Sequence, residues 1–220
     1  MPTPRHAVIA TLAFWALAAS AQTPAPVVLD DLHGLRIDKT EVTIAQFARY
    51  ARATGTTTRA EREGGGFEYV GGWQRRAGWT WQRPDGSQPD TDQLPAVHLT
   101  HAEAQEYCQW AGGRLPTAAE WRTAGFTELR SQPPTPWVRG TTYPWTTGHS
   151  PQGANTSDPD PWPRAAPVNA TAAGVNGRHD MGANVWEWAA DARGEERRTM
   201  GGSWWYPAAR MSRPGSLRTS

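Results

Sequence analysis

The stretch from Gly174 to Trp205 constrains the fold most strongly, because it mixes large aromatic residues with turn-forming ones and has no repeating period. It reads GVNGRHDMGANVWEWAADARGEERRTMGGSWW. Neither the roughly 3.6-residue period of an amphipathic helix nor the alternation of a half-buried strand is sustained along it. We therefore expect a rigid, irregular core loop that is held by packed rings and by contacts of loop oxygens, with the rest of the chain as its scaffold.

Residues 1–21 have the pattern of a secretory signal peptide. Arg5 supplies the basic segment, residues 7–18 form an apolar run, and residues 19–21 (Ala-Ser-Ala) make a small-residue cleavage site. The apolar run is too short to span a bilayer as a stable helix. No cysteine follows the cleavage site, so a lipoprotein anchor is not expected. The sequence thus predicts a periplasmic or secreted protein without a membrane anchor, whose mature chain begins near Gln22.

Charge and cysteine content narrow the classes of function. Removing residues 1–21 takes away one of the 22 basic residues and none of the 21 acidic ones, so the mature chain is close to neutral. A neutral chain argues against binding of nucleic acid through net charge. Cys108 is the single cysteine, so the many tryptophans or bound cations must provide the stability that disulfides give to other exported domains. We expect an extended lead-in over residues 22–33 and one domain over residues 34–220, as a monomer.

Three capping boxes of the form Thr-x-x-Glu or Thr-x-x-Gln predict where helices begin. The boxes occupy residues 43–46, 100–103 and 117–120. The first predicts a helix over residues 44–54 that ends at Gly55, and the second predicts a helix that ends at Gly112. The third predicts a helix that carries Trp121.

Strand signals are few, and long irregular regions separate them. Short strands are expected at residues 34–38 and 67–70, the second after a triple-glycine turn. Residues 127–173 are dominated by prolines and polar residues, with Tyr143-Pro144-Trp145 as the main anchor. A loop of this length in a compact domain needs something to pin it, and metal ligation would do so.

Two oxygen-rich clusters are candidates for a cation site. They comprise Asn155, Thr156, Asp158 and Asp160 in the first, and Asp180, Asn184 and Glu187 in the second. Hard cations such as calcium take carboxylate, amide and backbone carbonyl oxygens, which irregular loops can aim inwards. Asp and Asn also form turns in such loops, so the spacing by itself leaves both interpretations open.

Other candidate groups have simpler explanations. Cys108 lies on the apolar face of a predicted helix, where a free cysteine packs as a small hydrophobic residue. The histidines show no zinc-ligand spacing. The run Gly201-Gly202-Ser203-Trp204-Trp205-Tyr206, followed by arginines, is either the last core strand or the floor of a binding site, and the sequence favours neither.

Four motifs occur in order along the chain. They are residues 39–43 (KTEVT) with Phe47, residues 107–117 (YCQWAGGRLPT) with the Ala-Glu-Trp of residues 119–121, residues 181–188 (MGANVWEW), and residues 201–204 (GGSW) with spaced arginines after them. Together they resemble the sulfatase-modifying factor family, which includes the formylglycine-generating enzymes. The resemblance covers about residues 34–215.

The resemblance implies an α+β fold of the C-type-lectin-like type, with little regular secondary structure and with loops ordered by calcium. It implies a first calcium site made by the side chains of Asn155 and Asp160 and the carbonyls of Thr156 and Trp162. It implies a second site made by the side chains of Asp180 and Glu187 and the carbonyls of Ala183 and Val185. Asp180 stands where family members can have Asn, and either residue supplies an oxygen ligand.

The copper site of the family does not carry over to this chain. The formylglycine-generating members bind copper(I) through two cysteines after Gly-Gly-Ser, because that ion requires soft thiolates. Aligned on Gly201-Gly202-Ser203, those two positions hold Tyr206 and Met211. We therefore expect neither copper nor formylglycine-generating activity, and the catalytic residues are unknown.

Three functions stay open. The first is oxidative maturation of a peptide or protein substrate without copper and thiol chemistry. The second is a non-catalytic module that binds a peptide, protein or small molecule. Its expected ligand-binding residues are Trp186, Ser203, Trp204, Trp205, Tyr206, Arg210 and Arg213. The third is an inactive paralogue that is truncated, because family members continue to a closing Gly-Phe-Arg strand whereas this chain ends at Ser220. A missing strand would leave an unpaired sheet edge.

Overall fold

The computed structural model describes residues 27–29, 34–212 and 217–219. The predicted signal peptide, most of the lead-in and Arg213 lie outside the described residues. In chain order the elements are β1 (Val27–Leu29), β2 (Leu35–Ile37), α1 (Ile44–Thr54), α2 (Arg59–Arg62), β3 (Gly65–Tyr69), β4 (Trp73–Ala77), α3 (His101–Trp110), α4 (Ala118–Phe126), the 3-10 helix η2 (Val175–Gly177), β5 (Glu187–Arg193), β6 (Glu196–Met200), the 3-10 helix η3 (Ala208–Met211) and β7 (Leu217–Thr219).

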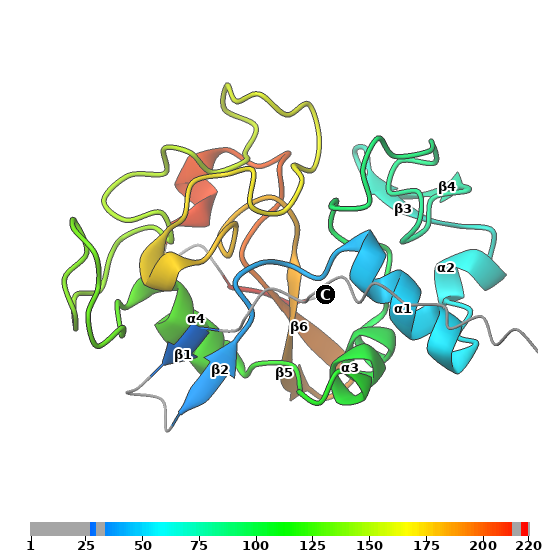
Figure 1. The fold of residues 1–220 in the computed structure, drawn as a ribbon. Helices are drawn as coiled ribbons and strands as arrows, with labels where there is room; N and C mark the ends of the chain where they lie inside the picture. The colour runs from blue at the N-terminus through cyan, green and yellow to red at the C-terminus, as the bar shows by residue number, and fades with distance from the viewer. Residues whose placement is uncertain (1–26, 30–33, 213–216, 220) are drawn as a thin grey trace, which may run out of the picture.

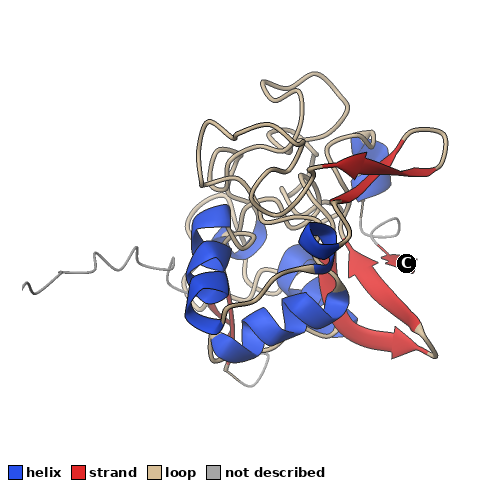
Figure 2. Cartoon of the chain, turned by 90° about the vertical axis from the view of Figure 1, so that its right-hand side faces the viewer, coloured by secondary structure: helices blue, strands red, loops and turns tan. Residues whose placement is uncertain are grey.

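The strands form three small antiparallel sheets, β1-β2, β3-β4 and β5-β6-β7. Figure 1 shows the β5–β6 hairpin between α4 on one side and the group formed by α1, α2 and α3 on the other. In Figure 2 loops make up most of the upper part of the molecule, and the longer helices lie in the lower part beside the largest strand hairpin. The predicted α+β fold with little regular secondary structure is therefore confirmed. No helix among the described residues has both the length and the apolar character needed to cross a membrane.

The three predicted helices begin at their capping boxes. In α1, the Thr43 side chain accepts a hydrogen bond from the Gln46 amide, and the Gln46 side chain accepts one from the Thr43 amide. The helix ends at Gly55, whose φ of 71° is the left-handed conformation that glycine adopts without strain. Helices α3 and α4 have the same arrangement at Thr100 and Thr117.

The sequence patterns do not predict two elements between α1 and α3. Helix α2 is a single turn that begins with a fourth capping box, Thr58-x-x-Glu61. Strand β4 pairs with β3 in a register that places Phe67 opposite Arg75 and Tyr69 opposite Trp73. Four of the five residues of strand β4 are exposed, and its sequence Trp-Gln-Arg-Arg-Ala lacks the alternation that marks a half-buried strand.

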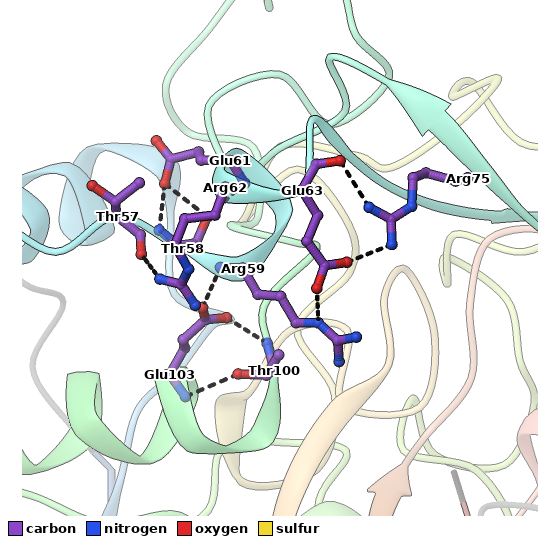
Figure 3. Close-up of polar contacts among 9 residues, drawn as sticks. All are labelled: Thr57, Thr58, Arg59, Glu61, Arg62, Glu63, Arg75, Thr100 and Glu103. Carbon is purple, nitrogen blue, oxygen red and sulfur yellow. Dashed lines mark hydrogen bonds and ion pairs between the residues drawn. The ribbon is translucent and has the colours of Figure 1, made fainter.

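A polar network joins α2, α3 and the β3–β4 hairpin (Figure 3). The Glu103 carboxylate accepts hydrogen bonds from the Thr100 amide at 2.8 Å and from the Arg59 amide at 2.5 Å, so that it caps two helices. Glu63 forms ion pairs with Arg59 and with Arg75 of β4. These pairs are exposed and each is worth little alone. Together they fix the base of the hairpin to the helices.

Two hydrophobic clusters form the core. The first surrounds α4 and contains Ala118, Trp121, Ala124, Phe126, Leu129, Met181, Ala189 and Met200. The second lies between α1 and α3 and contains Ile44, Phe47, Tyr50, Trp81 and Tyr107. Each fully buried large side chain contributes about 1.5–3 kcal/mol relative to exposure, so the aromatic residues carry much of the stability that disulfides would otherwise give.

The prediction of one irregular core loop over residues 174–205 is wrong for its second half. Residues 187–200 form the β5–β6 hairpin, which has a register shift between Trp188 and Ala192. Strand β5 is rich in alanine and acidic residues, so tertiary packing rather than strand propensity selects this conformation. Residues 174–186 are irregular apart from η2, as expected.

The run from Gly201 to Tyr206 is not the last core strand. Strand β6 ends at Met200, and the run that follows makes turns. The third strand of the sheet is β7, which pairs with β6 in a register that places Leu217 opposite Met200. Strand β6 is therefore paired along both of its edges.

Candidate functional site

Two buried glycines place the aromatic segment that follows β6. Gly201 has a φ of 77°, and a Cβ there would lie 2.7 Å from the Met181 carbonyl oxygen. A Cβ on Gly202 would lie 2.0 Å from the Met211 sulfur. A side chain at Gly201 would clash with the backbone, and one at Gly202 would displace the Met211 side chain. The backbone therefore passes close to the core here, and Trp204 and the two residues after it are half-buried.

Four aromatic rings make contact along this surface. The Trp186 and Tyr206 centroids are 5.5 Å apart, those of Trp204 and Trp205 are 5.3 Å apart, and those of Trp205 and Tyr206 are 5.7 Å apart. The predicted binding residue Ser203 is buried beside them, and its hydroxyl donates a hydrogen bond to the Asn184 carbonyl at 3.3 Å. Ser203 therefore supports the segment, and the four rings form the accessible wall.

Arg164 completes this wall, although its sequence context gives no signal of a site. Its guanidinium carbon lies 5.3 Å from the centroid of the Trp79 ring and 5.8 Å from that of Trp204. The sequence could reveal only a Trp-Pro-Arg run inside a proline-rich loop, which is more typical of a linker than of a site.

The aromatic wall faces a cleft with a volume of about 2380 Å³. Residues of strand β3, together with Trp79 and Asp85, also line this cleft. Arg210 packs over Tyr206 at 5.6 Å, but it is not one of the described residues that line the cleft. Of the predicted binding residues, the structure thus brings Trp186, Ser203, Trp204, Trp205 and Tyr206 to the cleft and leaves Arg210 outside it.

Asn184 connects the wall to the loops around it. Its side-chain oxygen accepts hydrogen bonds from Asn155 Nδ2 and from the Ala166 amide, both at 2.8 Å. Its side-chain nitrogen donates to Glu41 Oε1 at 3.0 Å, and its carbonyl accepts from the Trp204 amide at 2.9 Å. The sequence singles out Asn184 as an oxygen donor in a metal cluster, whereas the structure makes it a structural hub.

The first expected calcium loop is ordered around Asp160. The two carboxylate oxygens of Asp160 accept hydrogen bonds from the Thr156 and Trp162 amides, each at 2.8 Å. Asn155 is completely buried, and its Oδ1 has no hydrogen-bond partner. A buried carbonyl oxygen without a partner is costly, and a cation would satisfy it.

The second expected calcium loop lies within a cluster of acidic side chains. Burial raises the pKa of both Asp180 and Glu187 to about 7. Burial, together with the charges of Asp180 and Glu187, raises the pKa of Glu41 well above its usual value. One carboxylate oxygen of Asp180 and one of Glu41 have no hydrogen-bond partner.

The donor set of both loops fits a hard cation, because it consists of carboxylate, amide and carbonyl oxygens. No group of three or more His, Cys, Asp or Glu side chains in the described part of the chain is arranged to hold a metal ion. The expected calcium sites each combine two side chains with two carbonyls, so they remain predictions.

Residues 10–219 match the family model for the sulfatase-modifying factor enzyme 1-like domain. The chain belongs to this family. It is 31% identical over 201 residues to the formylglycine-generating enzyme of Thermomonospora curvata. The aligned region covers 76% of this chain and 62% of that protein. The chain therefore spans about three fifths of the length of this curated relative.

Relatives with other names also match the sulfatase-modifying factor domain of this chain. One is the inactive C-alpha-formylglycine-generating enzyme 2 of Mus musculus, which is 31% identical over 153 residues. That alignment covers 62% of this chain and 47% of the relative. Another is the hercynine oxygenase of Mycolicibacterium thermoresistibile, which is 31% identical over 196 residues. That alignment covers 79% of this chain and 39% of the relative. Among solved structures, PvdO from Pseudomonas aeruginosa shares the fold, with a TM-score of 0.59, 21% identity, and coverage of 84% of this chain and 74% of that chain.

The two positions where the resemblance places copper-binding cysteines have different surroundings in this family member. Tyr206 belongs to the accessible aromatic wall. Met211 is buried and packs against Gly202. A phenol and a buried thioether do not form a dithiolate pair, so these residues do not fit copper(I).

Cys108 packs against the cluster between α1 and α3, as predicted. Burial, with a smaller contribution from the charge of Asp38, raises the pKa of its thiol to about 11. The thiol therefore stays protonated near neutral pH. Only the deprotonated thiolate is a good nucleophile or soft metal ligand, so Cys108 is poorly suited to either role.

Proposed function

We propose that this domain binds an extended polypeptide segment in its cleft. The observation that carries the proposal is the accessible wall of four contacting rings, Trp186, Trp204, Trp205 and Tyr206. Rigid aromatic side chains bind ligands at a low entropic cost and are enriched at binding hot spots. The cleft volume of about 2380 Å³ exceeds the roughly 300–1000 Å³ of typical small-molecule sites. An extended chain uses such a volume better than a small metabolite does.

The proposal is tested by selecting peptides from a random display library on the purified protein and measuring their affinities. We expect Trp204→Ala to weaken the selected peptides by about tenfold or more, since truncation of a central aromatic residue removes a hot spot. Trp110→Ala is the matched control, because Trp110 is 46% exposed on α3 and does not line the cleft. Equal loss in both variants, or selection of no peptide, would contradict the proposal.

A second candidate function is oxidative maturation of the bound peptide or protein without copper and thiol chemistry. The names of two relatives, formylglycine-generating enzyme and hercynine oxygenase, favour it. The catalytic group is not assigned. Selected peptides are incubated with the protein in air and without oxygen, and their masses are compared. An oxygen-dependent mass change that requires Trp204 would support oxidation, whereas tight binding without a mass change would support a non-catalytic module.

We further propose that calcium occupies the two oxygen-rich loops. The support is the fit of the donor set and the buried, unpartnered oxygens of Asn155 and Asp180. Bound calcium would neutralise the carboxylates there and order both loops. The test is thermal unfolding with calcium and with excess chelator, since a ligand that binds only the folded state raises the melting temperature. A melting temperature independent of calcium would overturn this proposal.

The pattern of residues 1–21 supports a further proposal, that the protein works in the periplasm or after secretion. Cell fractionation and N-terminal sequencing test it. We expect a mature chain that begins near Gln22, outside the cytoplasm. An uncleaved chain in the cytoplasm would contradict export.

A further inference from the structure

We propose that Arg164 recognises a carboxylate on the ligand that occupies the cleft. The inference rests on the proposed binding function and adds the chemical class of the ligand, which is an aromatic or apolar group beside a carboxylate.

The guanidinium group of Arg164 is held in place before any ligand arrives. It packs against the rings of both Trp79 and Trp204, at 5.3 Å and 5.8 Å from the ring centroids. The Arg164 carbonyl accepts a hydrogen bond from Asn155 Nδ2 at 2.8 Å. Stacking fixes the plane of the guanidinium, so less side-chain entropy is lost when it binds a carboxylate.

The hydrogen-bond donors of Arg164 are accessible and only weakly engaged. The side chain is 45% exposed, and Glu68 Oε1 lies 4.0 Å from Nη2, beyond hydrogen-bond distance. The other oxygen of Glu68 pairs with Arg76 Nε at 2.8 Å. Asp85 also interacts electrostatically with Arg164, but its carboxylate accepts hydrogen bonds from the amide and hydroxyl of Ser87. Both nearby acids thus have partners of their own, and the planar fork of the guanidinium can take a second carboxylate.

The position of Arg164 combines this charge with the aromatic wall. Arg164, Trp79 and Trp204 all line the cleft. Arg210 also stacks on an aromatic ring, that of Tyr206, yet it is not among the described residues that line the cleft. Arg164 and Arg210 are thus both exposed and both contact aromatic rings, but only Arg164 is among the described residues that line the cleft, so Arg210 serves as the matched control.

The test uses two probes that differ in one charge, N-acetyltryptophan and its neutral amide, N-acetyltryptophanamide. Their affinities for the full chain are measured by ligand-observed NMR titration. We expect the acid to bind about tenfold more tightly than the amide, the preference typical of one hydrogen-bonded charge pair.

Arg164→Gln should remove this preference for the acid and leave the affinity for the amide unchanged. Arg164→Lys should retain only part of it, because lysine lacks the planar fork. Glu68→Gln should increase it, because a competing carboxylate is removed, and Arg210→Gln should preserve it.

The outcomes separate this inference from the binding function on which it rests. Equal affinities of the acid and the amide for the wild-type protein would overturn carboxylate recognition and leave the aromatic cleft as a binding site. A preference that survives Arg164→Gln, or that disappears in Arg210→Gln, would assign recognition to another residue and overturn the inference. Binding of neither probe would overturn it and would also count against the binding function.

Discussion

The side chain of Asp158 accepts a hydrogen bond from the backbone amide of Ala208 at 3.0 Å. One residue earlier, the Ser157 amide donates to the Tyr206 carbonyl at 2.9 Å. Two adjacent residues of the loop that contains Asn155 and Asp160 thus hold the segment that carries the aromatic wall. The order of this loop and the shape of the cleft are therefore coupled.

Replacing Asp158 tests this coupling. We expect Asp158→Ala to lower the free energy of unfolding by about 1 kcal/mol, the usual net value of one hydrogen bond, and to weaken peptide binding as well. Asp158→Asn keeps an acceptor oxygen and should change both quantities less. Urea unfolding and peptide titration provide the two measurements. Unchanged affinity in Asp158→Ala would show that the loop does not support the wall.

A larger loss of stability is expected from Asn184→Ala. The side chain makes four hydrogen bonds, to Asn155, Glu41 and both backbone groups of Ala166. Its removal leaves several buried polar groups unpaired, so the free energy of unfolding should fall by about 3 kcal/mol.

Asn169→Ala is the control for Asn184→Ala. Asn184 has a φ of 59° and Asn169 a φ of 67°, so alanine suffers similar backbone strain at both positions. Asn169 is exposed, and its replacement should cost about 1 kcal/mol or less. Equal losses in urea unfolding would mean that strain, and not the hydrogen bonds of Asn184, determines the effect.

The sequence predicts the parts of this fold that depend on local chemistry. The capping residues Thr43, Thr100 and Thr117 mark helix starts because a threonine hydroxyl and a glutamate or glutamine three residues later satisfy free amides locally. Strand β5 depends on its pairing with β6, which no local pattern encodes.

The candidate site divides in the same way. The Gly-Gly-Ser-Trp run indicates a close backbone approach beside large rings, but the sequence leaves open whether these rings belong to a core strand or to the floor of a binding site. The sequence does not predict a role for Arg164, because its two ring partners, Trp79 and Trp204, are distant in sequence and come together only in the folded chain.

Stability should depend on pH in a direction set by the acidic cluster. The pKa values of Asp180 and Glu187 rise from 3.8 and 4.5 to about 7 because of burial. Between about pH 4.5 and pH 7 the folded chain therefore binds more protons than the unfolded chain, so the metal-free protein should lose stability as the pH rises through this window. The hydrogen bonds from Arg114 lower the pKa of Glu120 to about 2, so protonation of Glu120 affects stability only below this pH window.

Glu187→Gln separates the contribution of this carboxyl group. Glutamine mimics the protonated acid and can still accept the hydrogen bond that Trp121 Nε1 donates to Glu187 Oε2. In chelator, the variant should lose less stability than the wild type between pH 5 and pH 7.5. With calcium at pH 7.5, only the wild type should gain stability if Glu187 is a ligand. The measurement is urea unfolding at both pH values, and parallel curves for the two proteins would contradict the role of Glu187.

Cys108 should react slowly with thiol reagents in the folded protein. The thiol packs among core residues between α1 and α3, and its pKa of about 11 leaves little thiolate at neutral pH. Labelling with a chromogenic disulfide at pH 7.5 should therefore be slow in buffer and fast in denaturant, where burial is lost. The control is Cys108→Ala, which should show no labelling in either condition because Cys108 is the single cysteine of the chain. Rapid, stoichiometric labelling of the folded wild type would show that the thiol is accessible and activated, and would reopen thiol chemistry for this domain.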